Sequence, residues 1–65
     1  MNIFYNLLME FTNGSTPCVG LLYRRHTKEL VNEAIKLKYI VECGENTYGE
    51  ILYTITSLGK SIRDN

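Results

Sequence analysis

The chain has 65 residues, of which seven are basic and seven acidic, so its formal net charge is zero. This length corresponds to one small domain, residues 1–65, and folding at this size hides only about 60% of the unfolded chain's surface. The balanced charge excludes the strong global field of a protein that coats nucleic acid non-specifically, so any nucleic-acid site must be local. Because a core this small gains from a second subunit, we expect a homodimer.

The sequence contains no pattern typical of a disulfide framework, a zinc knuckle or a targeting segment. Cys18 and Cys43 lie far apart and outside any Cys-x-x-Cys arrangement, so we predict that both are buried free thiols. The first residues include neither a basic leader nor a small-residue cleavage site, and no apolar run reaches membrane-spanning length. We therefore expect a cytoplasmic protein that does not bind a membrane.

Apolar residues at three- and four-residue steps predict a first helix over residues 2–11. The residues with this spacing are Ile3, Phe4, Leu7, Leu8 and Phe11. The polar cluster at residues 12–16 predicts a turn after the helix. Pro17 suits the first position of a second helix over residues 17–25, with Ser15 or Thr16 as its N-cap.

Thr27 is the expected N-cap of a third helix over residues 28–38, which has the clearest helical pattern in the chain. Its apolar stripe consists of Leu30, Val31, Ala34 and Leu37. A stripe of this kind predicts that one face of the helix packs on the core and leaves the opposite face to solvent.

Residues 39–43 and 50–55 have the composition of strands and flank a glycine-bounded turn at residues 44–49, which predicts a β-hairpin. In the second strand the alternation predicts that Ile51, Tyr53 and Ile55 face the core. Thr56 or Ser57 can cap a final short helix that runs through residue 63. The expected fold is therefore α+β, with three helices, a two-stranded hairpin and a short C-terminal helix.

Two segments resemble the winged helix-turn-helix superfamily, particularly the small MarR- and PadR-like regulators of bacteria, archaea and phage. Residues 33–40, Glu-Ala-Ile-Lys-Leu-Lys-Tyr-Ile, are similar to the end of a recognition helix that runs directly into the first wing strand. Residues 53–62, Tyr-Thr-Ile-Thr-Ser-Leu-Gly-Lys-Ser-Ile, are similar to the segment where that family leaves the wing. The resemblance implies that the hairpin is the wing. Lys38 departs from the family, which often has a glycine there to end the helix in the left-handed region.

No group of residues suggests catalysis, and we expect neither an enzyme nor a metal or cofactor site. The only histidine, His26, falls in the predicted turn between two helices, where we expect it to be solvated. Glu29 and Glu33 lie one helical turn apart, which is a surface feature and not a catalytic cleft. The five glycines are dispersed and form no phosphate-binding loop.

Five of the seven basic residues fall between Arg24 and Lys38, around the third helix. On a helical wheel Lys28, Asn32 and Lys36 lie opposite the apolar stripe, where asparagine suits adenine and lysine can reach guanine or a phosphate. The residues expected to contact phosphates are Arg24, Arg25, Thr27 and Lys38. These features favour a transcriptional regulator that binds double-stranded DNA sequence-specifically, with the third helices of a dimer in successive major grooves.

The acidic residues support an alternative interpretation. Glu29 and Glu33 also point toward the outward face of the third helix, and the hairpin contains three glutamates but no lysine or arginine. Because carboxylates repel phosphates, such a hairpin would not hold a DNA backbone. The hairpin glutamates are Glu42, Glu45 and Glu50. The alternative is a winged helix that binds another protein without binding DNA, and its possible anchors are Tyr5, Tyr39 and Tyr48.

Overall fold

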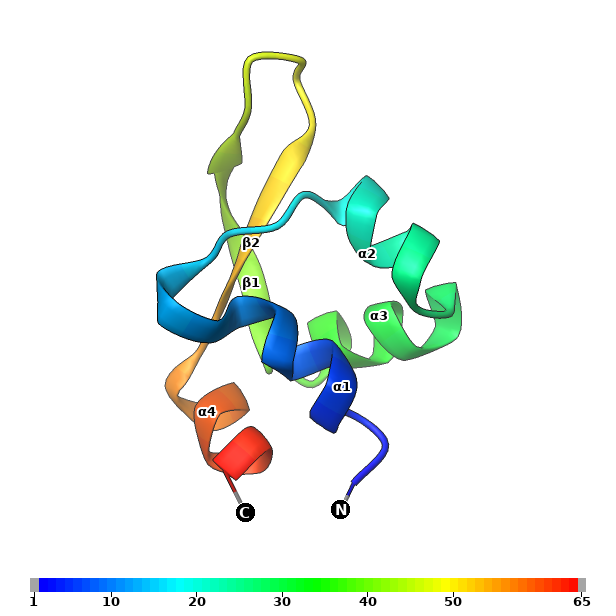
Figure 1. The fold of residues 1–65 in the computed structure, drawn as a ribbon, viewed down its shortest axis with the longest axis vertical. Coiled ribbons are helices and arrows are strands. Elements are labelled where there is room, and N and C mark those ends of the chain that lie inside the picture. The colour runs from blue at the N-terminus through cyan, green and yellow to red at the C-terminus, as the bar shows by residue number, and fades with distance from the viewer. Residues whose placement is uncertain (1, 65) are drawn as a thin grey trace.

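The computed structural model describes residues 2–64 as four helices, one 3-10 segment and an antiparallel two-stranded sheet (Figure 1). The elements in chain order are α1 (Tyr5–Leu8), η1 (Met9–Gly14), α2 (Val19–Arg25), α3 (Lys28–Lys36), β1 (Ile40–Glu45), β2 (Ile51–Ile55) and α4 (Ser57–Asp64). The predicted α+β class and the order of its elements are confirmed. Among residues 2–64, no helix has the length and apolar character needed to cross a membrane.

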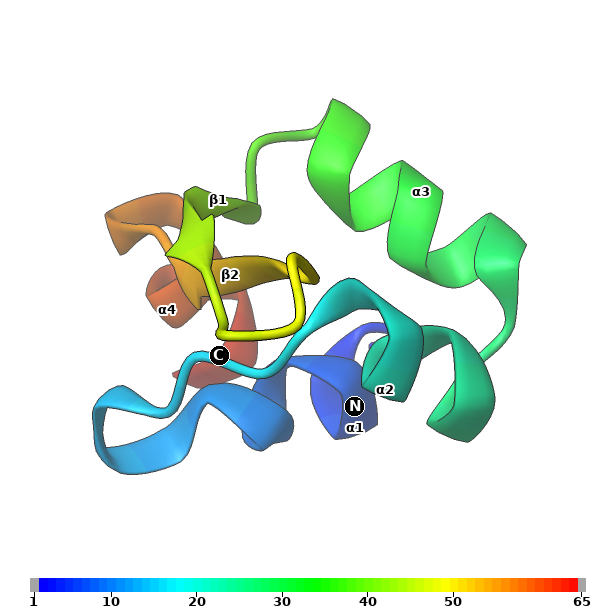
Figure 2. The ribbon, with the colours of Figure 1, turned by 90° about the horizontal axis from the view of Figure 1, so that it is seen from above.

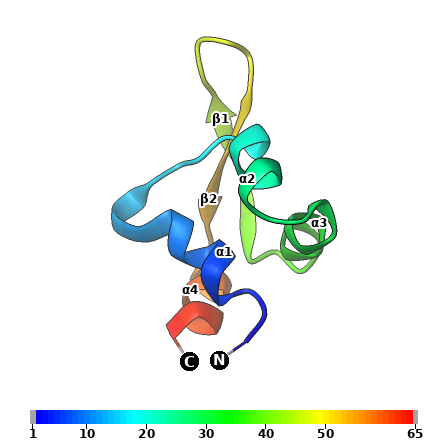
Figure 3. The same cartoon turned by 45° about the vertical axis from the view of Figure 1, so that its right-hand side comes forward.

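The hairpin extends away from a layer of helices, so the molecule is elongated, with principal extents of 34 × 21 × 19 Å. Figure 1 shows the β1–β2 turn at one end and both chain termini at the other. The two ends of the chain also lie close together in the rotated view of Figure 3, and the Asn2 side-chain amide donates a 2.9 Å hydrogen bond to the Ile62 carbonyl. This bond connects the segment before α1 to α4.

The core lies between α1, η1, α2, α3 and the base of the hairpin. Figure 2 shows from above how these elements surround one another. The buried side chains of the core are Phe4, Leu7, Leu8, Phe11, Leu22, Val31, Ala34, Ile40 and Tyr53. Phe4 also packs edge-on against the half-buried Tyr39 ring, with centroids 5.0 Å apart. The apolar spacing therefore predicted most of these residues, but it also placed Ile3 on the core face, and Ile3 is 75% exposed.

The first helix is much shorter than predicted. Regular α-helix covers only Tyr5–Leu8, and the chain continues as the 3-10 segment Met9–Gly14. Inside that segment Thr12 is extended and Asn13 adopts a left-handed conformation with φ 59°. The helix tightens and ends here because asparagine and glycine favour turn conformations over helix propagation.

The predicted start of the second helix is wrong, because α2 begins at Val19 and neither Ser15 nor Thr16 caps it. Ser15 and Cys18 are extended, and this part of the chain lies beside β2. The Tyr53 amide donates a 3.0 Å hydrogen bond to the Pro17 carbonyl, and Cys18 forms a β-bridge with Leu52. Pairing with β2 therefore holds residues 17 and 18 outside the helix.

The third helix begins as predicted, since the Thr27 hydroxyl accepts a 3.2 Å hydrogen bond from the Leu30 amide. It ends earlier than predicted, at Lys36, and Lys38 takes a left-handed conformation with φ 66°. Leu37 is consequently outside the helical stripe and 40% exposed, while Ile35 packs against the core. The sequence placed the left-handed position correctly but not the last residue of the helix.

The hairpin contains a bulge that the alternation of the sequence does not show. Glu42 pairs with Tyr53 and Gly44 pairs with Leu52, so Cys43 is the extra residue. Beyond the bulge the strands leave the core, and Ile51 is 37% exposed although we predicted that it faces inward. Both cysteines are free, but Cys43 is exposed and Cys18 is half-buried, so the prediction that both are buried is wrong.

Candidate nucleic-acid interface

The exposed face of α3 presents a row of polar side chains. Lys28, Asn32 and Lys36 are separated by four residues each, so they lie in line along the helix, and all three are exposed. Val31 and Ala34 anchor the opposite face in the core. This arrangement fixes the helix and leaves the row free to contact a partner.

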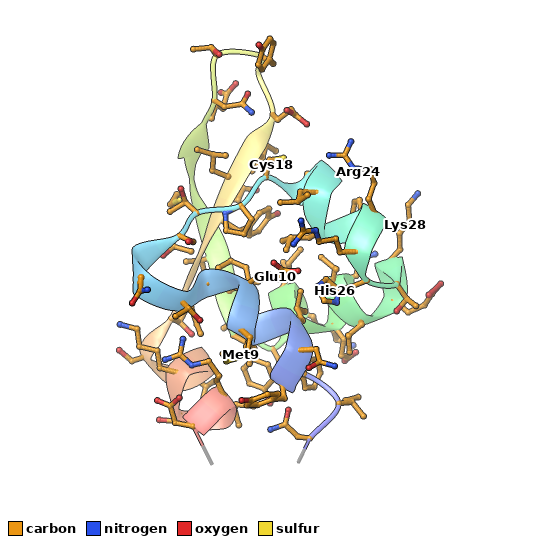
Figure 4. The ribbon with its side chains drawn as sticks, viewed as in Figure 1. Met9, Glu10, Cys18, Arg24, His26 and Lys28 are labelled. Carbon is orange, nitrogen blue, oxygen red and sulfur yellow. The ribbon has the colours of Figure 1, made fainter. Side chains whose placement is uncertain are left out.

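Arg24 extends the same basic surface from α2. It is the last but one residue of that helix and is exposed. In Figure 4 the side chains of Arg24 and Lys28 both project toward the end of the molecule that carries the hairpin turn. Only His26 and Thr27 separate α2 from α3, so the two helices hold these cations at neighbouring positions.

Arg25 occupies a different environment from Arg24. Its guanidinium Nη1 lies 3.2 Å from Glu10 Oε1, and its side chain is 60% exposed. The other oxygen of Glu10 lies 2.9 Å from His26 Nε2, as the adjacent side chains in Figure 4 illustrate. The His26 side chain is only 12% exposed, so the prediction of a solvated histidine is wrong. A carboxylate from η1 thus binds the end of α2.

Thr27 and Lys38 mark the two ends of α3. The Thr27 hydroxyl is used by the helix cap, although the residue remains exposed. Lys38 is exposed, and its carbonyl accepts a 2.6 Å hydrogen bond from the Thr56 hydroxyl. Its backbone is therefore fixed while its ammonium group faces solvent.

Tyr23 contacts the row on α3 from the side. Its hydroxyl donates a 2.8 Å hydrogen bond to Asn32 Oδ1, and its ring centroid lies 5.6 Å from Lys28 Nζ. Tyr23 belongs to α2, where it is half-buried and packs against the core. Nothing in the local spacing of the sequence relates position 23 to position 32, so this contact was not predicted.

The two acidic residues of α3 face another part of the molecule. Glu29 and Glu33 line an open groove of about 340 Å³ together with Leu30 and the segment that includes Ile3 and Phe4. Tyr23 contacts the Lys28 and Asn32 side of the helix, whereas the groove lies on the Glu29 and Glu33 side. Lys28 and Asn32 therefore face α2, whereas Glu29 and Glu33 face the N-terminal segment.

The hairpin adds acidic groups and no basic ones. Glu42, Glu45 and Glu50 are all exposed. The Glu50 carboxylate accepts hydrogen bonds from the Asn46 amide at 3.0 Å and from the Cys18 thiol at 3.6 Å. Tyr48 at the turn is 87% exposed. The hairpin therefore adds no positive charge to the basic surface of α2 and α3.

Other chemistry has little support in the described part of the chain. Residues 2–64 contain no cluster of three or more histidine, cysteine, aspartate or glutamate side chains placed to bind a metal. Burial raises the pKa of the Tyr53 phenol above its usual value, with smaller contributions from the charge of Glu42 and from Tyr23. Tyr53 is a core residue and not part of the groove beside α3.

Comparisons with protein families, curated proteins and solved structures found no match to this chain.

Proposed function

We propose that this protein is a winged helix-turn-helix domain that binds duplex DNA sequence-specifically, as a transcriptional regulator does. The observation that carries the proposal is the exposed row Lys28, Asn32 and Lys36 on a capped helix, with Arg24 on the same side. An exposed helix of this kind fits the major groove, where asparagine reads adenine and lysine contacts guanine or phosphate. The short connection between α2 and α3 and the hairpin after α3 agree with this architecture.

The division of charge on α3 defines how the helix would approach DNA. Its basic edge, which Lys28 and Arg24 form with α2, would face the phosphates, and Glu29 and Glu33 would lie toward the other side. The acidic hairpin would stay away from the backbone because of charge repulsion. In a homodimer, two α3 helices would enter successive major grooves about one DNA turn apart.

The test is a fluorescence anisotropy titration of mixed-sequence duplex DNA at about 50 mM and about 150 mM salt. We expect salt-dependent binding that weakens in Arg24→Ala and Lys36→Ala. Lys60→Ala is the matched control, because Lys60 is an exposed lysine on α4. Absence of binding by the folded protein, or equal weakening by all three substitutions, would contradict the proposal.

Protein binding by the hairpin is a second candidate function. It is favoured by the 87% exposed Tyr48 at the turn of a strand pair that carries only acidic charges. Tyrosine is enriched in interface hot spots, and the glutamates would complement a basic protein surface. Tyr48→Ser tests this function, since it should leave DNA binding unchanged and abolish binding to such a partner.

A further inference from the structure

The contact between Tyr23 and Asn32 joins the two helices at the centre of the candidate interface. The Tyr23 hydroxyl donates to Asn32 Oδ1 at 2.8 Å. Tyr23 is itself held by packing against the core, whereas Asn32 is exposed on α3. A fixed side chain therefore restrains one that would otherwise rotate freely in solvent.

This bond determines which atoms of the Asn32 amide face outward. Oδ1 points at Tyr23, so the Nδ2 amide group, with its two donors, points away from it. The carbonyl oxygen of an amide has two lone pairs, and one of them stays available when Tyr23 occupies the other. The outward edge thus offers a donor and an acceptor, which is the pattern that matches N7 and the N6 amino group of adenine.

The same tyrosine also contacts the neighbouring residue of the row. Lys28 Nζ lies 5.6 Å from the centroid of the Tyr23 ring, within the range of a cation–π interaction. This interaction keeps the ammonium group beside Asn32 on the edge of α3 that faces α2. One aromatic side chain from α2 thereby organises two of the three polar residues along α3.

We propose that Tyr23 is a positioning residue, which orients the Asn32 amide to read an adenine in the major groove of duplex DNA. This inference rests on the proposed function and specifies one base within its target. The hydroxyl of Tyr23 acts through Asn32 and does not itself contact the base. Its removal should reduce discrimination at one adenine and leave the phosphate contacts, and hence the salt dependence, unchanged.

The first experiment measures the order of the Asn32 side chain without DNA. In ¹⁵N relaxation measurements, we expect the Nδ2 amide of Asn32 to be ordered in the wild-type protein and mobile in Tyr23→Phe, which keeps the ring. Tyr5→Phe is the control, because Tyr5 is a half-buried tyrosine of α1. Equal mobility in the wild type and Tyr23→Phe would overturn the positioning role, whatever the protein binds.

The second experiment measures base reading. A duplex is selected from a random pool with the wild-type protein, and each adenine is then replaced in turn by 7-deazaadenine, which lacks the N7 acceptor. At one position we expect the replacement to weaken wild-type binding by up to about tenfold, because the hydrogen bond from Nδ2 to N7 is lost. The loss should shrink to about twofold in Tyr23→Phe and vanish in Asn32→Ala.

The outcomes separate this inference from the proposed function. Salt-dependent, selective binding with a full 7-deazaadenine effect in Tyr23→Phe would overturn the role of Tyr23 and leave DNA binding intact. If the protein binds selectively but no 7-deazaadenine replacement weakens binding, the inference that Asn32 contacts an adenine is wrong. If the wild-type protein enriches no duplex at all, both the proposed function and this inference fail. Circular dichroism of each variant checks that the variant is folded like the wild-type protein.

Discussion

Glu10 and Arg25 form an ion pair in which Nη1 of Arg25 lies 3.2 Å from Oε1 of Glu10. The pair connects η1 to the last residue of α2, and the second oxygen of Glu10 binds His26. Because Arg25 is 60% exposed, a pair of this kind contributes only about 0–1 kcal/mol to stability. Its larger effect is electrostatic, since it places a negative charge beside a cation of the candidate interface.

Glu10→Gln should strengthen DNA binding. The substitution removes the charge but keeps an acceptor for Arg25, so the local potential becomes more positive. We expect about a two- to fivefold gain in affinity at low salt, similar for all sequences, because the added attraction acts on phosphates. Anisotropy titrations measure the gain. Asp64→Asn at the end of α4 is the control, and an equal gain in both variants would show that only net charge matters.

Gly59→Ala should destabilise the protein although alanine favours helices. Gly59 is buried in α4, and an added Cβ would lie 2.8 Å from Ile55 Cγ1 and would overlap the Tyr39 carbonyl. Such overpacking costs about 1–3 kcal/mol. Without the overlap, the substitution would stabilise the helix by about 1 kcal/mol. The sign of the change in chemical denaturation therefore tests the packing of α4 on the hairpin, with the exposed Ser61→Ala as control.

Lys38→Asn should stabilise the protein by up to about 1 kcal/mol, because asparagine tolerates the left-handed conformation better than lysine. Lys38 has φ 66° at the junction between α3 and β1. Lys36→Asn is the matched control inside the helix, where the same exchange should cost a few tenths of a kcal/mol, roughly the difference in helix propensity. Denaturation midpoints of the two variants that shift in the same direction would contradict this explanation.

The predictions that succeeded depend on neighbours in the sequence. Thr27 caps α3 because its side chain reaches an amide three residues ahead, and Val31 and Ala34 are buried because their spacing matches one helical turn. The end of α3 was misplaced by two residues, although the unusual backbone at Lys38 was anticipated.

Several of the predictions that failed depend on contacts between distant residues. Pro17 lies outside α2 because its carbonyl binds the Tyr53 amide, 36 positions further along the chain. The His26 side chain is only 12% exposed and bonds to Glu10, which is 16 residues away. The link from Tyr23 to Asn32 likewise crosses from one helix to the next. Periodicity and capping rules describe a few residues at a time, so they cannot reveal these partners.

Tyr53 should make the protein sensitive to alkaline pH. Burial raises the pKa of its phenol above 10.0, and the charge of Glu42 raises it further. Well below pH 10.0 the phenol is protonated in both the folded and the unfolded chain, so the full stability is present. Above that pH the unfolded chain releases its proton first, and the free energy of unfolding falls until the folded phenol ionises as well.

Tyr53→Phe should therefore flatten the decline of stability between about pH 9 and about pH 11, after allowance for its effect at neutral pH. Tyr48→Phe is the control, because the Tyr48 side chain is 87% exposed at the hairpin turn and should leave the decline as in the wild type. Denaturant titrations followed by circular dichroism measure the free energy of unfolding at each pH. If both variants and the wild-type protein lose stability in parallel, the ionisation that destabilises the fold belongs to a group other than Tyr53.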